Sequence, residues 1–448
     1  MEDYLQKIEE NQDLNAFLEV FAHDARARAT VLDAKLKHGT AGKLAGMVIG
    51  IKDNIVYKDH RVSASSKILE GFQSLYSATV VERLLEEDAI IIGRLNCDEF
   101  AMGSSNRFSA YGAVKNPLDK NRVPGGSSGG SATAVAAGLC LASLGSDTGG
   151  SIRQPASFTG TYGFKPSYGR ISRHGLIAFA SSFDQIGPFA NSVEDIALLY
   201  EVMAGADSFD NTVSHKEVSS INDVPAPGKK RIAYFRDVME SEHIDADVRK
   251  ESEALIEKLK ADGHTVEAVD FPLLDYMVPV YYILTTAEAS SNLARYDGIH
   301  FGYRSENAHD LESTYKLSRT EGFGPEVKRR ILLGTFVLSS GYYDAYYGKA
   351  QKTRRLVLEK TEELFKDFDL IFSPTTPHTA FPIDQNQEDP TKAYLEDIFT
   401  VHANIAGIPA ISVPMAKHSN GLPLGMQFSA AKYQEAELLR FVQTLVHN

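Results

Sequence analysis

Two glycine- and serine-rich runs lie close together in the sequence, at Val123–Leu139 and Leu144–Ser157. In the second run, Gly149 and Gly150 precede Ser151, and glycine lets the backbone turn so that neighbouring N–H groups face one point. Such a group of donors can hold the negative oxygen that forms when a hydroxyl attacks an amide carbonyl. The runs therefore indicate a serine nucleophile with an oxyanion site beside it.

Three different roles for these runs fit less well. A flexible linker does not continue directly into core-like sequence such as "ATAVAAGLCLASL". A phosphate-binding loop needs a lysine that follows neither Gly130 nor Gly150. The dinucleotide fingerprint needs a strand directly before Gly125 and a suitably spaced acid, and neither is evident.

A serine nucleophile needs a base, and Lys52 is the best candidate for that base. It ends the apolar run "GMVIGI", which is typical of a buried strand, and residues at strand ends commonly face a catalytic cleft. A lysine base must be neutral, so burial has to lower its pKa by several units. Taken alone, Lys52 would more often be a surface lysine, and only the serine runs favour the catalytic role.

These motifs together resemble the amidase signature family of amide hydrolases. The resemblance rests on "GGSSGGS", "DTGGSIRQPA" and the lysine of "GIKDNI". It implies a Ser–cis-Ser–Lys triad, with Ser151 as nucleophile, Lys52 as base, and Ser127 as the bridging serine after a cis Gly126–Ser127 bond. The family's oxyanion donors map to the backbone around Thr148, and thus to Thr148, Gly149, Gly150 and Ser151.

Longer segments resemble one branch of that family, the glutaminase subunits of tRNA-dependent amidotransferases. The segments include "NCDEFAMGSSN" and "GTYGFKPSYGRISRHG". This resemblance implies glutamine as the substrate, with Arg330 for its α-carboxylate, Asp397 for its α-ammonium, and Tyr281 in the same pocket; Ser128 is a further expected substrate contact. Arginine and carboxylate side chains suit those two charged groups. Without the resemblance, Arg330 would be interpreted as a solvated helix charge.

The same branch implies partners for this chain. Ammonia would pass to a B subunit that holds the tRNA and uses ATP and Mg²⁺, while a small C-type subunit completes the assembly. The tRNA substrate would be glutamyl-tRNA(Gln), aspartyl-tRNA(Asn) or both. The chain itself is expected to need no metal and no cofactor.

Composition agrees with an acidic protein that does not bind nucleic acid by itself. The formal net charge is −13, and the basic clusters at 328–330 and 352–355 are too small for a nucleic-acid surface. No apolar run is long enough for a bilayer, and the first ten residues do not resemble a secretory signal. With only two cysteines, we expect a cytoplasmic protein of bacterial type rather than one of an organellar matrix.

The pattern of elements predicts an α/β fold. We expect one large domain over residues 1–448, with a mixed, mostly parallel, twisted sheet covered by helices on both faces. Residues 1–40 are expected to be helical because apolar residues recur there at helical spacing. Residues 207–230 are polar, contain proline and glycine, and should form an exposed connection.

Other helices and strands are predicted further along. Strands are expected at "RIAYF", "HTVEAVDF", "DLIFSPTTP", "PAISVPM" and "LGMQFSA", the last two joined by a turn at Asn420-Gly421. Residues 324–368 should be mostly helical, with Pro325 in a first turn. A further helix opened by Asp389-Pro390 should carry Asp397 on a half-buried face.

Three rival functions remain to be weighed. A stand-alone amidase for small or lipid amides would need an apolar tunnel in place of the Arg330 and Asp397 pair. A catalytically silent scaffold subunit is disfavoured because Lys52, Ser127 and Ser151 are all present. A phosphate- or ATP-binding module is disfavoured because the glycine runs lack its motif.

Overall fold

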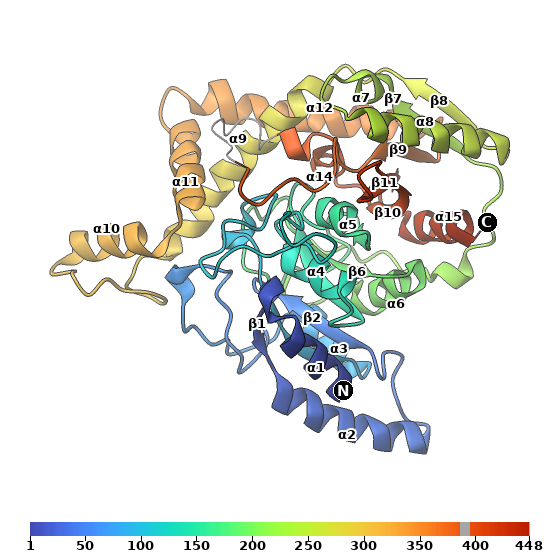
Figure 1. Cartoon of the computed structure of the whole chain (residues 1–448). Coiled ribbons are helices and arrows are strands. Elements are labelled where there is room, and N and C mark those ends of the chain that lie inside the picture. The colour runs from blue at the N-terminus through green and yellow to red at the C-terminus, as the bar shows by residue number, and fades with distance from the viewer. Residues whose placement is uncertain (386–394, 448) are drawn as a thin grey trace.

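The strands of the protein form one sheet at its centre (Figure 1). The computed structural model describes residues 1–385 and 395–447. Within them the strands are β1 (Phe17–Val20), β2 (Val48–Lys52), β3 (Ile90–Leu95), β4 (Ala142–Asp147), β5 (Tyr162–Lys165), β6 (Gln185–Ala190), β7 (Arg231–Phe235), β8 (Thr265–Val269), β9 (Leu370–Pro374), β10 (Ala410–Lys417) and β11 (Pro423–Ala430). All eleven join in the order β1-β3-β2-β4-β6-β5-β10-β11-β9-β7-β8.

The sheet is mixed, as predicted, but the expectation that it is mostly parallel is wrong. Parallel pairs join β2 to β3 and β4, and β7 to β8 and β9. The other six pairs are antiparallel: β1–β3, β4–β6, β5–β6, β5–β10, β10–β11 and β9–β11. Short connections such as the predicted turn between β10 and β11 favour antiparallel neighbours, whereas parallel neighbours need a longer crossover.

Helices surround this sheet. They are α1 (Glu2–Glu10), α2 (Ala22–His38), α3 (Thr79–Glu86), α4 (Gly129–Ala136), α5 (Arg153–Thr159), α6 (Val193–Met203), α7 (Arg236–Glu240), α8 (Ala246–Ala261), α9 (Leu274–Asn292), α10 (Leu311–Gly322), α11 (Pro325–Leu338), α12 (Lys349–Leu364), α14 (Val401–Ile405) and α15 (Glu435–His447). In the described residues, no helix combines the length and the apolar character that a bilayer crossing needs.

Helices cover both faces of the sheet, as the alternation along β2 shows. Val48 belongs to an apolar cluster with Ala132 of α4. Its neighbour Ile49 belongs to a different cluster, with Val80 of α3 and Ile196 of α6. Successive side chains of a strand point to opposite faces, so α4 lies on one face and α3 and α6 lie on the other.

The N-terminal prediction is partly wrong. Residues 1–40 contain the helices α1 and α2, but strand β1 lies between them. Phe17, expected on a helix face, pairs instead with Leu95 of β3 in an antiparallel ladder. The helical spacing of the apolar residues was therefore overridden by hydrogen bonding along the free edge of β3, which sequence spacing does not reveal.

Residues 207–230 follow the prediction of an irregular connection. Among them the structure has one turn of 3₁₀-helix, Ile221–Asp223, and no strand of the sheet. Most of their side chains are exposed, although Asp210 is buried and pairs with Arg173. The strands before and after the connection belong to the same sheet.

The region predicted to be helical at 324–368 is confirmed. It contains α11, with Pro325 at its start, a π-helical turn η6 (Tyr343–Gly348), and α12. In Figure 1, α10 and α11 extend away from the sheet.

The helix expected at Asp389-Pro390 begins outside the described residues. At Leu395–Asp397 the chain forms a 3₁₀ turn, so Asp397 is not on the predicted α-helix. This turn leads towards the short helix α14, which packs against α9.

Candidate active site

Lys52 lies at the end of β2, on the face that α4 covers, and has no solvent-exposed surface. Its Nζ atom is hydrogen-bonded to the Oγ atoms of Ser127 at 2.8 Å, Ser128 at 2.9 Å and Ser146 at 2.9 Å. Asn54 donates a further hydrogen bond to the Ser146 hydroxyl at 2.9 Å. Ser127 and Ser128 come from the first glycine-rich run and Ser146 from the end of β4, so two neighbouring strands and one loop hold the amine.

Burial lowers the pKa of Lys52 to about 8, although Cys97, Asp98 and Asp147 nearby raise it. A buried ammonium loses the stabilisation that water gives to its charge, which favours the neutral amine. The neutral amine has a lone pair and can accept a proton from one of the hydroxyls around it. The direction of this shift is the one that a lysine base requires, because it raises the fraction of neutral amine.

The backbone around Ser127 explains why the first run is rich in glycine. The Gly126–Ser127 peptide bond is cis, as the resemblance implied. A side chain at Gly126 would collide with the carboxylate of Asp98, and the Gly126 N–H donates to Oε1 of Gln154 at 2.9 Å. Glycine therefore permits the close approach that directs the Ser127 hydroxyl to the lysine.

The two glycine-rich runs meet at Ser151. The N–H of Ser128 donates to the carbonyl oxygen of Ser151 at 3.2 Å. Ser127 is fully buried, whereas Ser151 retains 7% of its surface exposed. Among residues 1–385 and 395–447 no hydrogen bond joins the hydroxyls of Ser127 and Ser151, so the predicted contact of Lys52 with Ser127 is confirmed and the relay from Ser151 stays a prediction.

The turn at 148–151 has the donors that an oxyanion site needs. Within the described parts of the chain, the N–H groups of Gly149, Gly150 and Ser151 donate to no acceptor. Gly150 has a φ of +141°, a conformation that residues with a side chain rarely adopt. The hydroxyl of Thr148 donates to Asp184 at 2.7 Å, which fixes the start of the turn.

A buried ion pair that the sequence reasoning missed anchors this turn. Arg153 donates to both carboxylate oxygens of Asp147, at 3.2 and 3.1 Å, and neither side chain is exposed. Arg153 also reaches the C-terminal part of the chain, with hydrogen bonds to the Thr400 carbonyl at 2.9 Å, Gln427 at 2.6 Å and Asn404 at 2.6 Å. The nucleophile turn is thus held by residues far later in the chain.

The residues predicted to bind substrate gather beside the same turn. A side chain at Gly149 would collide with the ring and hydroxyl of Tyr281, so Tyr281 of α9 lies directly against the oxyanion donors. Its neighbour Tyr282 donates a hydrogen bond to Asp397 at 2.9 Å, and the centre of its ring lies 5.3 Å from the guanidinium carbon of Arg330. The structure therefore brings Tyr281, Arg330 and Asp397 together, as predicted.

Arg330 is buried but keeps part of its hydrogen-bonding capacity. Its Nε donates to Glu326 at 2.8 Å on the same helix, α11. Burial lowers the pKa of Arg330, but the opposite effects of Tyr282 and Glu326 outweigh it. The pKa is therefore raised above its usual value, and the guanidinium is charged. Its two terminal nitrogens donate to no acceptor in the part of the chain that the structure describes, which leaves them available to a carboxylate.

Asp397 is also buried, and its surroundings shift its pKa in opposite directions. Burial raises the pKa of Asp397 to about 7, although the hydrogen bond from Tyr282 and the charge of Arg330 lower it. A cation placed beside Asp397 would favour the ionised form. Tyr282 and Glu326, which are hydrogen-bonded to Asp397 and Arg330, were not predicted, although both lie in segments that match the family.

The structure does not support the expectation that the Ser128 side chain contacts substrate. Ser128 is fully buried, and its hydroxyl is hydrogen-bonded to Lys52 and donates to the carbonyl oxygen of Ser146 at 3.1 Å. The hydroxyl faces β4 rather than the exposed side of Ser151. It belongs to the group that holds the lysine.

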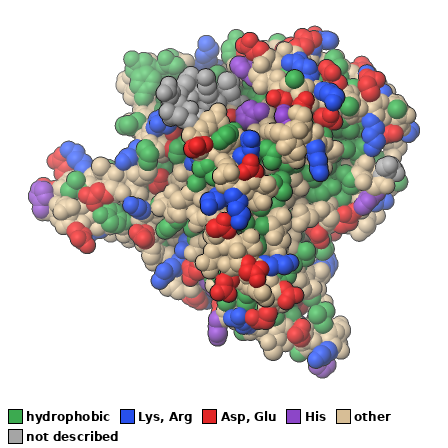
Figure 2. Space-filling model, in the orientation of Figure 1, with side chains coloured by type: hydrophobic (Ala, Val, Ile, Leu, Met, Phe, Trp, Pro, Cys, Tyr) green, Lys and Arg blue, Asp and Glu red, His purple; other side chains and the backbone are tan. Residues whose placement is uncertain are grey.

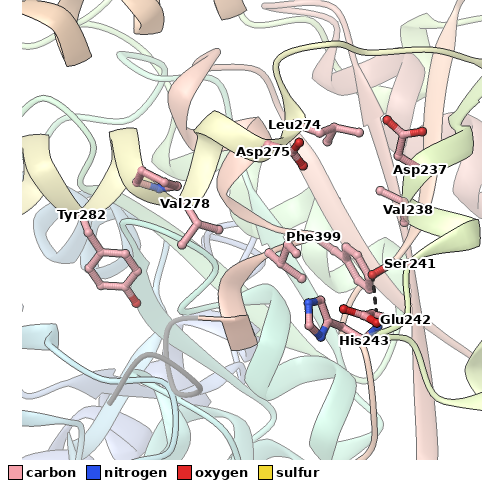
Figure 3. A pocket seen from close by; sticks show the side chains of 12 residues that line it. Asp237, Val238, Ser241, Glu242, His243, Leu274, Asp275, Val278, Tyr282 and Phe399 are labelled. Atoms are coloured by element: carbon pink, nitrogen blue, oxygen red, sulfur yellow. Dashed lines mark hydrogen bonds between the residues drawn. The ribbon is translucent and has the colours of Figure 1, made fainter. Parts of the chain in front are cut away.

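A cavity of about 620 Å³ opens beside this cluster (Figure 3). Tyr282 closes one end of it, and the far end lies between α7 and the start of α9, at Asp237 and Leu274. Lys52 and Ser151 do not line the cavity, so it does not contain the reacting groups.

One group of side chains in the described residues has the spacing of metal ligands: Asp245, Asp247 and His418. Asp245 already accepts the N–H of Asp247 as the cap of α8, and Asp247 accepts the N–H of Ser419. These contacts explain the cluster as part of the structure around the β10–β11 turn. We assign no metal to it.

Comparisons with known proteins agree with this arrangement. A model of the amidase family matches residues 1–439. The A subunit of glutamyl-tRNA(Gln) amidotransferase from Chlorobaculum tepidum is 53% identical over 451 residues, which cover 99% of this chain and 93% of that protein. The protein of that name from Koribacter versatilis is 50% identical, over 100% of this chain and 94% of its own length.

Solved structures have the same fold. The crystal structure of the A subunit of glutamyl-tRNA(Gln) amidotransferase from Thermotoga maritima matches with a TM-score of 0.82 and 39% identity, over 100% of this chain and 90% of that one. A native peptide amidase from Stenotrophomonas maltophilia matches with a TM-score of 0.83 and 27% identity, over 100% and 92% of the two chains.

Proposed function

The chain belongs to the amidase family, and from this premise we propose that it is the glutaminase subunit of a tRNA-dependent amidotransferase. It would hydrolyse glutamine to glutamate and ammonia, and the ammonia would serve to amidate glutamyl-tRNA(Gln), aspartyl-tRNA(Asn) or both. The observation that carries the proposal is the buried hydrogen bond of Lys52 to Ser127 at 2.8 Å, next to the turn of Ser151, which keeps 7% of its surface exposed.

The chemistry begins with a proton transfer. Neutral Lys52 takes a proton from Ser127, which takes one from Ser151, and the Ser151 oxygen attacks the side-chain amide carbon of glutamine. The negative oxygen of the resulting intermediate accepts hydrogen bonds from the N–H groups of Gly149, Gly150 and Ser151. Each such donor stabilises the transition state by about 3–4 kcal/mol.

The intermediate then breaks down to an ester, and water hydrolyses that ester. The protonated lysine returns a proton through Ser127 to the leaving nitrogen, so the carbon–nitrogen bond breaks and ammonia departs. Water then attacks the glutamyl ester on Ser151, again with Lys52 as the base, and glutamate is released. The sum of these steps is glutamine plus water giving glutamate plus ammonia.

Substrate selection falls to the cluster beside the turn. The free terminal nitrogens of Arg330 suit the α-carboxylate of glutamine, and Asp397 suits its α-ammonium. The hydroxyl of Tyr281, against Gly149, lies where the side-chain amide must enter. A stand-alone amidase for apolar amides would have no use for this buried pair of opposite charges, which costs free energy unless a ligand or a neighbour compensates it.

The remaining steps belong to other subunits. We propose that the tRNA, ATP and Mg²⁺ bind to a B subunit, that a C-type subunit completes the assembly, and that the complex works in the cytoplasm. The net charge of −13 supports this division because an acidic chain is a poor surface for RNA.

The test compares amides that differ in their charged groups. We expect the assembled complex to release ammonia from glutamine and to prefer it to acetamide, which lacks both charges, by roughly 10⁴-fold in kcat/KM. Comparable rates on acetamide would support the stand-alone amidase instead. No ammonia from either amide, in the presence of the partner subunits, would remove the enzymatic assignment.

A further inference from the structure

The helical arm formed by α10, α11 and η6 carries an unusual share of the exposed apolar side chains. Eighteen large hydrophobic side chains of the described residues are more than a third exposed, and ten of them lie between Ile299 and Leu356. That segment is only about an eighth of the chain. Exposed apolar groups that gather in one place indicate a surface that another molecule covers.

The first part of this surface is a groove of about 280 Å³ between α10 and α11. Three cations line it, Lys316, Arg319 and Lys328, together with apolar groups that include Leu332. No acidic residue is among the described residues that line the groove. Arg319 is fixed because its guanidinium carbon lies 5.2 Å from the ring centre of Tyr315 and its Nη1 donates to the Leu293 carbonyl.

The second part is an exposed aromatic cluster at the end of α11. Phe336 lies 4.4 Å from Tyr342 and 5.9 Å from Tyr346 between ring centres, and the three rings are each at least 40% exposed. Leu332 joins the groove to this cluster because it precedes Phe336 by one helical turn and is 70% exposed. In Figure 2 hydrophobic side chains gather at the upper left, where Figure 1 places the end of α11 and the start of α12.

We propose that this arm surface, made of Lys316, Lys328, Leu332, Phe336, Tyr342 and Tyr346, docks an acidic, amphipathic segment of another subunit. We choose an acidic segment because its charge is opposite to that of the residues lining the groove. The chain as a whole has a net charge of −13, yet the groove presents only cations, so an acidic segment is repelled by most of the protein and attracted here. The apolar side chains of that segment would pack on Leu332 and Phe336.

Two other occupants fit less well. An RNA surface needs a broad basic stripe, whereas the described residues that line the groove include three cations. A second copy of this chain would approach with a net charge of −13 and be repelled by the rest of the protein outside the groove. The proposal also rests on the proposed function, which requires other subunits. Aromatic residues with few charges are typical of the centre of a protein–protein interface.

The test uses the chain together with the B and C-type subunits of the same organism. The double variant Leu332→Ser/Phe336→Ser removes the apolar anchors, and Lys316→Glu/Lys328→Glu reverses the charge of the groove. All four side chains are on the surface, so folding should persist, which thermal unfolding checks. Leu75→Ser/Leu36→Ser, at residues 83% and 53% exposed elsewhere, is the matched control.

We expect each arm variant to weaken binding to the other subunits by about 10- to 100-fold, with the control unchanged. The charge-reversal variant should also lower the salt dependence of binding. If the wild-type chain binds no other subunit, the proposed function fails. If the wild type binds and the arm variants bind equally well, this inference fails while the function stands.

Two further readouts decide between occupants. A loss of self-association of the isolated chain, seen by sedimentation, without loss of subunit binding would assign the surface to a second copy and overturn the proposal. A loss of tRNA binding alone, with the subunit complex intact, would assign it to RNA and overturn it equally.

Discussion

The lysine–serine centre and the Tyr281–Arg330–Asp397 cluster lie side by side but are built in different ways. The centre comes from strand ends and turns between residues 52 and 151, and it is held by the sheet. The cluster comes from the helices α9 and α11 and the turn at 395–397, all outside the sheet. Under the proposed function, the difference separates reaction from recognition, so changes to one region should leave the other largely intact.

Replacing the nucleophile is the most severe way to test that separation. Ser151→Ala should lower the rate of ammonia release by about four orders of magnitude or more, because no other hydroxyl can form the ester. Glutamine binding, measured by calorimetry, should remain because the recognition cluster is untouched. Ser208→Ala, an exposed serine elsewhere, is the control, and a rate within about tenfold of wild type for Ser151→Ala would refute the nucleophile.

Removing the base is expected to be nearly as damaging. Lys52→Met keeps an unbranched side chain in the buried site but should lower kcat/KM by about 10³-fold or more. In the wild type, the neutral amine is the active form, so kcat/KM should fall as the pH drops below about 8 and level off at a plateau above that pH. The rates of Lys52→Met should lose this dependence; a wild-type profile with unchanged midpoint in that variant would exclude Lys52 as the base.

Substitutions in the Tyr281–Arg330–Asp397 cluster should change the KM for glutamine rather than kcat. Arg330→Gln should raise the KM for glutamine about 30- to 100-fold, since a hydrogen-bonded charge pair contributes about 2–3 kcal/mol. The neighbouring Arg329→Gln, at a half-exposed side chain on the same helix, should change KM by less than about twofold.

Glu326→Gln shows whether the loss of the ion pair with Arg330 explains the first result, since it removes the negative charge beside Arg330 but keeps the cation and an oxygen that can accept its hydrogen bond. An equal loss of kcat and of kcat/KM in Arg330→Gln would place the arginine in the chemical step and blur the separation of the two regions.

The smallest expected effect tests how the hydroxyls around Lys52 set its pKa. Ser146→Ala removes one of three hydroxyls around Nζ, so the ammonium is less well stabilised and the pH midpoint should move below about 8. We expect a loss of about tenfold in kcat/KM, with KM for glutamine unchanged. Ser143→Ala on the same strand, whose hydroxyl donates to the Ser131 carbonyl instead, should leave the midpoint in place.

The sequence made the centre predictable because its parts are short motifs. Ser151 follows two glycines and Lys52 ends an apolar run, so residue types suggested a nucleophile and a base, whereas the role of Ser127 came from the resemblance to the amidase signature family. Ser146 and Arg153 lie in the same stretch and were missed, because a serine at a strand end and an arginine in a helix have many ordinary uses. Their roles follow only from contacts with Lys52 and with Thr400.

The fold was predictable to a similar degree. Apolar runs such as the one at β2 predicted strands, but periodicity does not say which strands become neighbours, so the antiparallel majority was missed. Phe17 shows the same effect, since its ladder with Leu95 joins residues far apart in the sequence. Tyr282 escaped for this reason too, because its partner Asp397 lies far along the chain, whereas the Glu326–Arg330 pair at helical i,i+4 spacing could have been found from the predicted helix.

The tie between Arg153 and Gln427 has a consequence for biosynthesis. Ribosomes make the nucleophile turn early, but three of its fixed points, Thr400, Asn404 and Gln427, emerge only near the end of synthesis. Until then the buried guanidinium lacks most of its partners. The nucleophile turn can therefore reach its complete set of hydrogen bonds only close to the end of synthesis.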